Sequence, residues 1–239
     1  MLSARRGQPL GSAVVDVVDE YTGHVEPSGS AARRTLDALT ITKISVGPMD
    51  NNAYLLVCRN TREALLIDAA NEPDRLSDLI GHDADRPTLR TIVTTHQHQD
   101  HWGALGAIAG AYGANTIAHE EDASPLPVPP DRFVTQGDTV PVGDCVLEVI
   151  HLRGHTPGSL ALLYRDPAGH GHLFTGDSLF PGGVGRTTSP ENFSSLINDV
   201  SSRIFDKLPD DTWFYPGHGD DSTLGIERPH LDEWRQRGW

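Results

Sequence analysis

The chain has 239 residues, which suits one large domain or two small ones with a buried core. Lys and Arg number 19 against 33 Asp and Glu, and the resulting net charge of −14 argues against nucleic acid or anionic membranes as binding partners. The sequence holds no run of about 18 apolar residues that could span a membrane and no convincing signal peptide, so we expect a cytoplasmic protein.

Residues 1–37 are rich in Gly, Ser, Pro and charged residues and show little hydrophobic periodicity. We expect them to form an N-terminal extension that is extended or partly disordered. From residue 38 the pattern changes, and residues 38–239 are predicted to form a single catalytic domain. Its first segments, "LTITKISV" and "NAYLLV", are joined by the turn-rich "GPMDN" and predict two antiparallel strands.

The middle of the chain alternates predicted strands and helices. A buried strand, "EALLID", ends at Asp68 and is followed by a helix that begins near Pro73 and stops at Gly81. A strand, a helix of small residues and another strand then follow, in the order "LRTIVTT", "GALGAIAGAYG" and "ANTIAHE".

The second half repeats this arrangement. Four short strands are predicted in "DTVPVG", "CVLEVIHL", "LALLYRD" and "HLFTGD", and a last one in "DTWFYPG". Between them lies a helix that Ser189 can cap and Pro190 can open. Its apolar stripe consists of Phe193, Leu196, Ile197, Val200, Ile204 and Leu208. The pattern predicts two packed sheets with helices outside, in two similar halves.

Polar side chains with metal-binding chemistry follow four of the predicted strands, in segments far apart in the chain. They are His96, His98, Asp100 and His101, then His155, Asp177 and His218. Strand ends on a sheet scaffold are the usual place for a ligand site. Imidazole and carboxylate groups suit Zn²⁺, Mn²⁺ or Fe.

The spacing suggests two ligand sets. His96 and His98 would grip one ion with His155, and a second ion would be held by Asp100, His101 and His218. Asp177, with two oxygens, could bridge both ions, and a water shared by two such ions becomes a nucleophile near neutral pH.

Each motif taken alone has a plainer interpretation. The "HxH" pair could lie in an ordinary loop, Asp177 could be a turn aspartate, and "PGHG" could be a tight turn. In "GHTPGS", Thr156 and Ser159 could simply organise a Pro-Gly turn. Four such blocks, each at a strand end, favour the metal site.

The blocks "THQHQDHWG", "GHTPGS", "FTGDSLF" and "YPGHG" resemble the signature motifs of the metallo-β-lactamase fold superfamily, and most closely those of its glyoxalase II-like hydrolases. The resemblance covers residues 40 to about 225. It implies an α/β fold, a four-layer αββα sandwich of two mixed sheets flanked by helices, with a dinuclear metal site at one edge. It also implies the same two ligand sets, with Asp177 as the bridge.

Three further features follow from the resemblance. Arg186 and Thr187, in the loop after Asp177, would lie near the mouth of the site, although a structural salt bridge for Arg186 is an equal alternative. Asp68 would orient ligands beneath the metal loop or would cap a strand end. Full-length glyoxalase II has a C-terminal helical domain with basic residues that hold glutathione, but only 21 residues follow His218 here. Glutathione specificity is therefore open, and the C-terminal arginines are either anion contacts or ordinary surface residues: Arg228, Arg235 and Arg237.

The leading functional hypothesis is a metal-dependent hydrolase of acyl thioesters, similar to hydroxyacylglutathione hydrolase. A metal-bridging hydroxide would attack the carbonyl, with Asp100 and Asp177 as ligands around it. We expect two divalent ions per chain, Zn²⁺ before Fe or Mn, a small-molecule substrate, and a monomer or homodimer. The alternatives are a persulfide dioxygenase with one iron on His96, His155 and Asp177, or a lactonase or β-lactamase of the same fold. A ribonuclease is disfavoured by the acidic charge.

Overall fold

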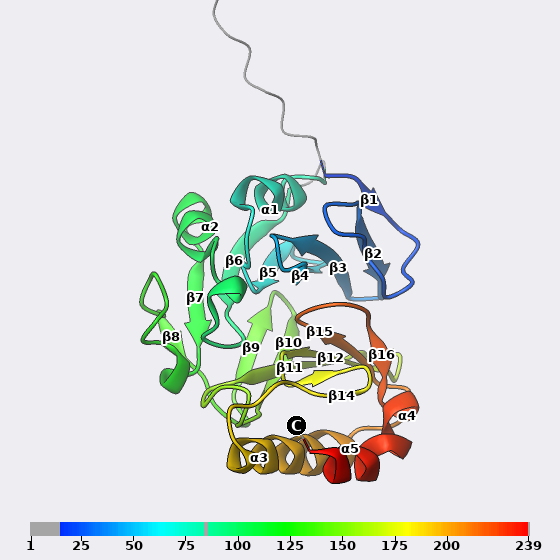
Figure 1. Cartoon of the computed structure of the whole chain (residues 1–239). Coiled ribbons are helices and arrows are strands. Elements are labelled where there is room, and N and C mark those ends of the chain that lie inside the picture. Colours follow the sequence, from blue (N-terminus) through cyan, green and yellow to red (C-terminus); the bar gives the residue numbers. More distant parts are fainter. Residues whose placement is uncertain (1–14, 84–85, 239) are drawn as a thin grey trace, which may run out of the picture.

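The structure is a computed structural model that describes residues 15–83 and 86–238, and it has four layers. Two helices cover the outer face of the first sheet and three cover the outer face of the second (Figure 1): α1 (Pro73–Ile80) and α2 (Leu105–Tyr112), then α3 (Pro190–Val200), α4 (Leu224–Glu227) and α5 (Leu231–Arg237). The predicted αββα sandwich is confirmed. Within the described ranges, no helix is both long and apolar enough to cross a membrane.

The first sheet has eight strands in chain order within the described residues. They are β1 (Val17–Val18), β2 (Ala31–Thr35), β3 (Leu39–Val46), β4 (Asn51–Cys58), β5 (Glu63–Ile67), β6 (Thr88–Val93), β7 (Asn115–Ala118) and β8 (Arg132–Phe133). The pairs from β2 to β5 are antiparallel and those from β5 to β8 are parallel. The predicted antiparallel pair β3 and β4 is therefore confirmed.

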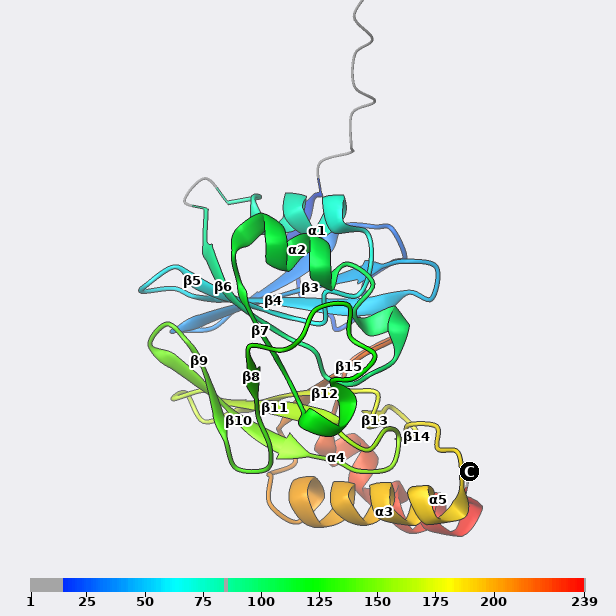
Figure 2. The same cartoon turned by 90° about the vertical axis from the view of Figure 1, so that its left-hand side faces the viewer.

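The second sheet has the order β16-β15-β12-β11-β10-β9 in the same part of the chain. Its strands are β9 (Thr139–Val142), β10 (Cys145–His151), β11 (Leu160–Arg165), β12 (Gly171–Gly176), β15 (Trp213–Pro216) and β16 (Ser222–Thr223). Only β12 and β15 pair in parallel. A short hairpin, β13 (Leu179–Phe180) with β14 (Gly183–Val184), stands apart from both sheets (Figure 2).

The two sheets share an apolar core between their inner faces. Leu56 and Val93 from the first sheet and Leu147, Leu162 and Phe174 from the second are fully buried in one apolar cluster. Removing this surface from water is the main force that holds the sheets face to face. The strand ends that carry the polar motifs are therefore fixed relative to one another.

The predicted helix signals are confirmed in α1 and α3. Pro73 stands at the first turn of α1, and the backbone N–H of Gly81 bonds back to the last turn. The Ser189 hydroxyl accepts a hydrogen bond from the Asn192 N–H (3.2 Å) at the start of α3. The apolar stripe of α3 packs on the second sheet and continues through a π-helical turn, Ser201–Phe205.

The expected N-terminal extension is wrong for residues 15–37. This segment contains β1 and β2, which form the edge of the first sheet, and Ala31 is fully buried. The strand signal is masked in the sequence by Arg33 and Arg34. Arg33 pairs with Asp83 at 2.8 Å, and the Arg34 guanidinium stacks 3.9 Å from the Trp213 ring centroid, so the sheet accommodates both charges. Residues 1–14 of the expected extension lie outside the described residues.

A buried ion pair ties the N-terminal segment to the second sheet. The Lys43 ammonium group, on β3, donates to the Asp221 carboxylate (2.7 Å) and to the carbonyl oxygens of Gly23 (2.7 Å) and Gly219 (2.8 Å). Both charged side chains are completely buried. The Tyr21 hydroxyl also donates to Asp221 at 2.5 Å. Since Gly219 follows His218, this ion pair anchors one of the predicted metal-binding loops.

We expect Lys43→Met to destabilise the protein strongly, because it leaves the Asp221 carboxylate buried without its cation. Breaking one side of a buried ion pair typically costs about 3–5 kcal/mol. Urea unfolding followed by circular dichroism measures the change in the free energy of unfolding.

The matched control is Arg165→Gln, which breaks the exposed ion pair between Arg165 and Glu148. Exposed pairs contribute at most about 1 kcal/mol, so this variant should unfold almost like wild type. Equal losses in the two variants would contradict the role assigned to Lys43.

Candidate metal centre

The predicted ligands come from four loops that meet at one edge of the sandwich. His96, His98, Asp100 and His101 follow β6, and His155 follows β10. Asp177 follows β12 and His218 follows β15, the parallel pair of the second sheet. The structure therefore brings all seven side chains together.

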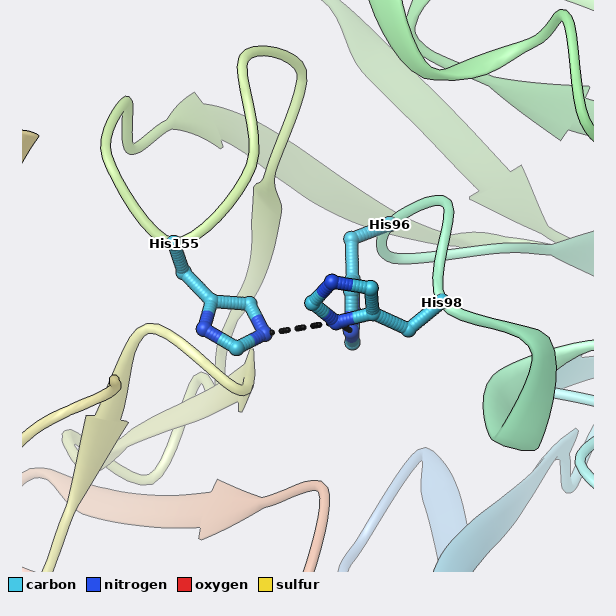
Figure 3. A group of neighbouring side chains, drawn as sticks. All are labelled: His96, His98 and His155. Carbon is cyan, nitrogen blue, oxygen red and sulfur yellow. Dashed lines mark hydrogen bonds between the residues drawn. The ribbon is translucent and has the colours of Figure 1, made fainter. Parts of the chain in front are cut away.

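The first group consists of three imidazoles that point toward one another (Figure 3). His98 Nδ1 lies 3.0 Å from His96 Nε2 and 3.0 Å from His155 Nε2. Burial and the neighbouring imidazoles lower the pKa of His96 well below its usual value, which keeps this ring neutral. Neutral imidazole is the form that binds metals.

The second group consists of Asp100, His101 and His218. The Asp100 carboxylate lies 3.3 Å from His218 Nε2 and 3.6 Å from His101 Nε2. Hydrogen bonding from His218 holds the pKa of Asp100 far below its usual value, so this carboxylate is ionised at neutral pH.

Asp177 lies between the two groups and reaches both. One of its oxygens is 3.3 Å from His101 Nε2, and the other is 3.7 Å from His155 Nε2 and 3.6 Å from His218 Nε2. Burial opposes ionisation, but the imidazoles around Asp177 lower the pKa of its carboxyl group.

Hydrogen bonds outside the cluster orient four of the five rings. His155 Nδ1 donates to the Arg186 carbonyl (2.7 Å) and His218 Nδ1 to the Met49 carbonyl (2.9 Å). A carbonyl can only accept, so the proton is on Nδ1 and the Nε2 lone pair faces the site. The Asp68 carboxylate fixes the His101 ring in a similar way, and the Thr95 hydroxyl, which itself donates to Asp68, fixes the His96 ring.

Asp68 is the shared support of the loop after β6. One oxygen accepts from the Thr95 N–H (2.7 Å), and the other accepts from His101 Nδ1 (2.9 Å) and from the Thr95 hydroxyl (2.8 Å). Because that hydroxyl donates to Asp68, it accepts from His96 Nδ1 at 3.0 Å. Asp68 also has a left-handed backbone (φ 57°), which is strained for a residue other than glycine. Asp68 thus contacts both the His101 ring and the Thr95 backbone, so its predicted ligand-orienting role stays a prediction that the Asp68→Asn variant tests.

The chemistry of the cluster fits a divalent cation. His101 Nε2 and Asp177 Oδ1 are buried, face each other at 3.3 Å, and have no hydrogen-bond partner within the described residues. Although burial opposes it, the carboxylates of Asp177 and Asp68 raise the pKa of His101 to about 10, so Nε2 carries a proton that a bound metal ion would have to displace. The cluster therefore attracts positive charge at the point where the ligand atoms converge.

Three supporting residues were not predicted from the sequence. The Asn51 amide donates to Asp100 (2.9 Å) and contacts His218 Nε2 (3.3 Å). Asp122 is buried and accepts from the N–H groups of Gln97 (3.0 Å) and Gly158 (2.8 Å), which joins the His98 loop to the His155 loop. Gly217 lies so close that a Cβ there would stand 2.2 Å from Asp177 Oδ1. Of these three residues, only Gly217 lies in a motif that the sequence singled out, "PGHG".

Thr156 and Ser159 organise the turn, as their plainer interpretation predicted. The two hydroxyls lie 2.6 Å apart, the Thr156 N–H donates to Ser159 (3.2 Å), and the Thr156 hydroxyl bonds Asp122. They support His155 without facing the ligand atoms.

A further group with metal-binding side chains, His119, Glu121 and His151, lies next to this network. Its two rings stack on each other with centroids 4.1 Å apart. His119 Nδ1 accepts the Glu121 N–H (3.2 Å) and His151 Nε2 donates to the Pro157 carbonyl (2.7 Å). Protein partners thus occupy these nitrogens, unlike those of the main cluster.

The remaining predicted residues have different surroundings. The Arg186 side chain is exposed, and no ion pair of Arg186 is found within the described residues. Thr187 lines a hollow near the start of α3. Of the C-terminal arginines, Arg228 pairs with Asp210 at 2.5 Å and Arg235 bonds Asn198 at 2.8 Å.

Comparison with known proteins identifies the class. The profile of the Metallo-beta-lactamase superfamily matches residues 46–218, which is most of the chain. The chain therefore belongs to this superfamily, and its seven-residue cluster occupies the loops that the motifs predicted.

The relatives narrow the class to glyoxalase II-like metallo-hydrolases. A hydroxyacylglutathione hydrolase from Polaromonas sp. is 34% identical over 176 residues, which are 70% of this chain but only 62% of that protein. The hydroxyacylglutathione hydrolase GloC from Haemophilus influenzae is 30% identical over 192 residues, which are 72% of this chain and 88% of that protein. Among solved structures, ETHE1 from Myxococcus xanthus has a TM-score of 0.70 at 30% identity, covering 82% of this chain and 84% of that one. The chain thus spans less than two thirds of the Polaromonas relative.

We expect Asp68→Asn to weaken metal binding, because the amide cannot accept from both His101 and Thr95 as the carboxylate does. Loss of such a ligand-orienting group typically costs about 10- to 100-fold in metal affinity. Competition against a chromophoric chelator measures the affinity directly.

Asp74→Asn, which removes an exposed carboxylate from α1, is the control and should bind metal like wild type. An unchanged affinity in Asp68→Asn would show that Asp68 only ends the strand.

Proposed function

We propose that the protein hydrolyses acyl thioesters of small molecules with two divalent ions per chain. The observation that carries the proposal is the position of Asp177, whose two oxygens reach both groups of ligand atoms. The similarity to two hydroxyacylglutathione hydrolases supports the choice of thioesters.

The proposed ligands of the first ion are His96, His98 and His155, and those of the second are Asp100, His101 and His218. Asp177 would bridge them. Nitrogen and oxygen donors of this kind suit Zn²⁺ best, with Fe and Mn as alternatives. When bound, such ions supply Lewis acidity, which lowers the pKa of water and polarises an acyl carbonyl.

The protein's own residues have a positioning role in this scheme. The fixed Nδ1 protons of four histidines aim the ring lone pairs at the ions, and Asp100 stays ionised because of its low pKa. A carboxyl group with so low a pKa is a poor proton acceptor. We therefore assign Asp100 primarily a metal-ligand role, and a role in proton transfer only second. A thiolate leaves readily, so the reaction needs no strong general acid.

Residues of the loop beside the metal centre are proposed to contact the substrate. Arg186 and Thr187 lie in the loop that orients His155. Arg153 lines the same hollow as His98 and His155, but Asp199 holds its guanidinium in a two-fold hydrogen bond (2.9 Å each). Arg186 is therefore the better candidate for an anionic part of the substrate.

The main alternative is the persulfide dioxygenase, which would need only His96, His155 and Asp177. The complete second group of ligands argues for two ions instead.

A turnover panel distinguishes the hypotheses: S-lactoylglutathione, other acyl thioesters, a lactone, a cephalosporin and a persulfide. We expect thioester cleavage without oxygen and two ions per chain by elemental analysis. Oxygen uptake with the persulfide at one iron per chain would overturn the proposal.

We expect His98→Ala to lose at least roughly 100-fold in kcat/KM, or about 2.7 kcal/mol of transition-state stabilisation, because it removes a ligand of the first ion. Since the His98 side chain is exposed, the fold should survive, and circular dichroism checks this.

The control is His170→Ala, which removes an exposed histidine that pairs with Asp211. It should retain full activity and metal content. Wild-type turnover in His98→Ala would rule out this site.

A further inference from the structure

A groove extends from the metal centre along the start of α3 to α5. It consists of three adjoining hollows of about 400, 390 and 350 Å³. The first contains His98, His155 and Thr188, and the second begins at Thr187 and Thr188. The second and third share Phe193 and Arg237. Because consecutive hollows share lining residues, they are neighbours along the start of α3.

The third hollow is apolar and lies among β13, β14, α3 and α5, whose ends approach one another in Figure 2. Phe180, Val184 and Phe193 are half-buried on its walls, and the buried Trp234 ring forms part of its lining. Its volume lies within the range of small-molecule sites, roughly 300–1,000 Å³. Half-buried aromatic walls favour an apolar occupant.

Arg237 gives this apolar hollow a single positive charge. Its guanidinium donates to the Gly182 carbonyl at 3.0 Å, which holds it at the edge of the hollow. Over residues 15–83 and 86–238 it makes no ion pair, whereas Arg228 has Asp210. In a chain with a net charge of −14, an arginine with no carboxylate partner among the described residues is suited to bind an anion.

We propose that the groove is an extended substrate site for an apolar segment that ends in a carboxylate, with the carboxylate on Arg237. This inference rests on the proposed function, because the reacting carbonyl would lie at the metal centre. The segment can belong to the acyl group or to the thiol, since the groove meets the metal centre at His98 and His155.

Direct binding tests the groove without activity. We expect 4-phenylbutyrate to bind the metal-loaded protein, and Arg237→Gln to weaken it about tenfold in isothermal titration calorimetry. Arg235→Gln is the matched control, because Arg235 bonds Asn198 on α3 and does not line the groove. Neutral 4-phenylbutanol should bind equally to all three proteins. If the carboxylate of phenylbutyrate instead binds the metal ions, phenylbutyrate should bind Arg237→Gln as tightly as wild type. This result would overturn the proposal.

Two kinetic series identify the source of the segment. The first series uses thioesters of a short neutral thiol, in which the acyl group is an aryl chain that ends either in a carboxylate or in its methyl ester. The second series uses acetyl thioesters, in which the thiol carries the same two aryl chains. We expect a roughly tenfold preference in kcat/KM for the carboxylate in one series, lost in Arg237→Gln and kept in Arg235→Gln. Thioester cleavage with no such preference in either series would refute this inference alone. No thioester cleavage, with phenylbutyrate binding that still depends on Arg237, would refute the proposed function and leave the groove as a ligand site.

Discussion

The site depends on one electrostatic constraint: histidine Nε2 atoms and the carboxylate oxygens of Asp100 and Asp177 converge to within 3.3–3.7 Å of one another. His101 Nε2 and Asp177 Oδ1 face each other, buried and without a hydrogen bond among the described residues. Four imidazoles have their Nδ1 protons fixed by outside acceptors, which aims their Nε2 lone pairs inward. Leaving such groups unpaired is costly, and the two divalent ions that we propose would satisfy them.

The sandwich supplies the rigidity that this arrangement needs. The ligand loops leave both sheets at one edge, so the shared core fixes their separation. Asp68 joins the supports of His96 and His101, and Asp122 joins the two loops of the first ligand group. Lys43 donates to the Gly219 carbonyl and thereby fixes the loop that carries His218. The N-terminal segment takes part through Gly23 and Tyr21, although it precedes the region that matches the family profile.

Sequence reasoning reached the fold and the seven residues of the cluster because both leave local signals. Apolar runs, Pro73 and Ser189 mark the elements, and the clustered histidines stand directly after strands. The supports are different, since Asn51 meets His218 across 167 positions and Lys43 meets Asp221 across 178. Nothing near either residue indicates its partner. The strand β2 was missed because it contains two adjacent arginines, which made the segment look like a polar loop. Their partners, Asp83 and Trp213, are far away in the sequence.

Anomalous diffraction at the zinc edge from crystals of the zinc-loaded protein is the most direct test of the two-ion centre. It should show two peaks about 3.5–4 Å apart, with the Asp177 carboxylate in contact with both. A single peak, or two peaks that Asp177 does not join, would contradict the account.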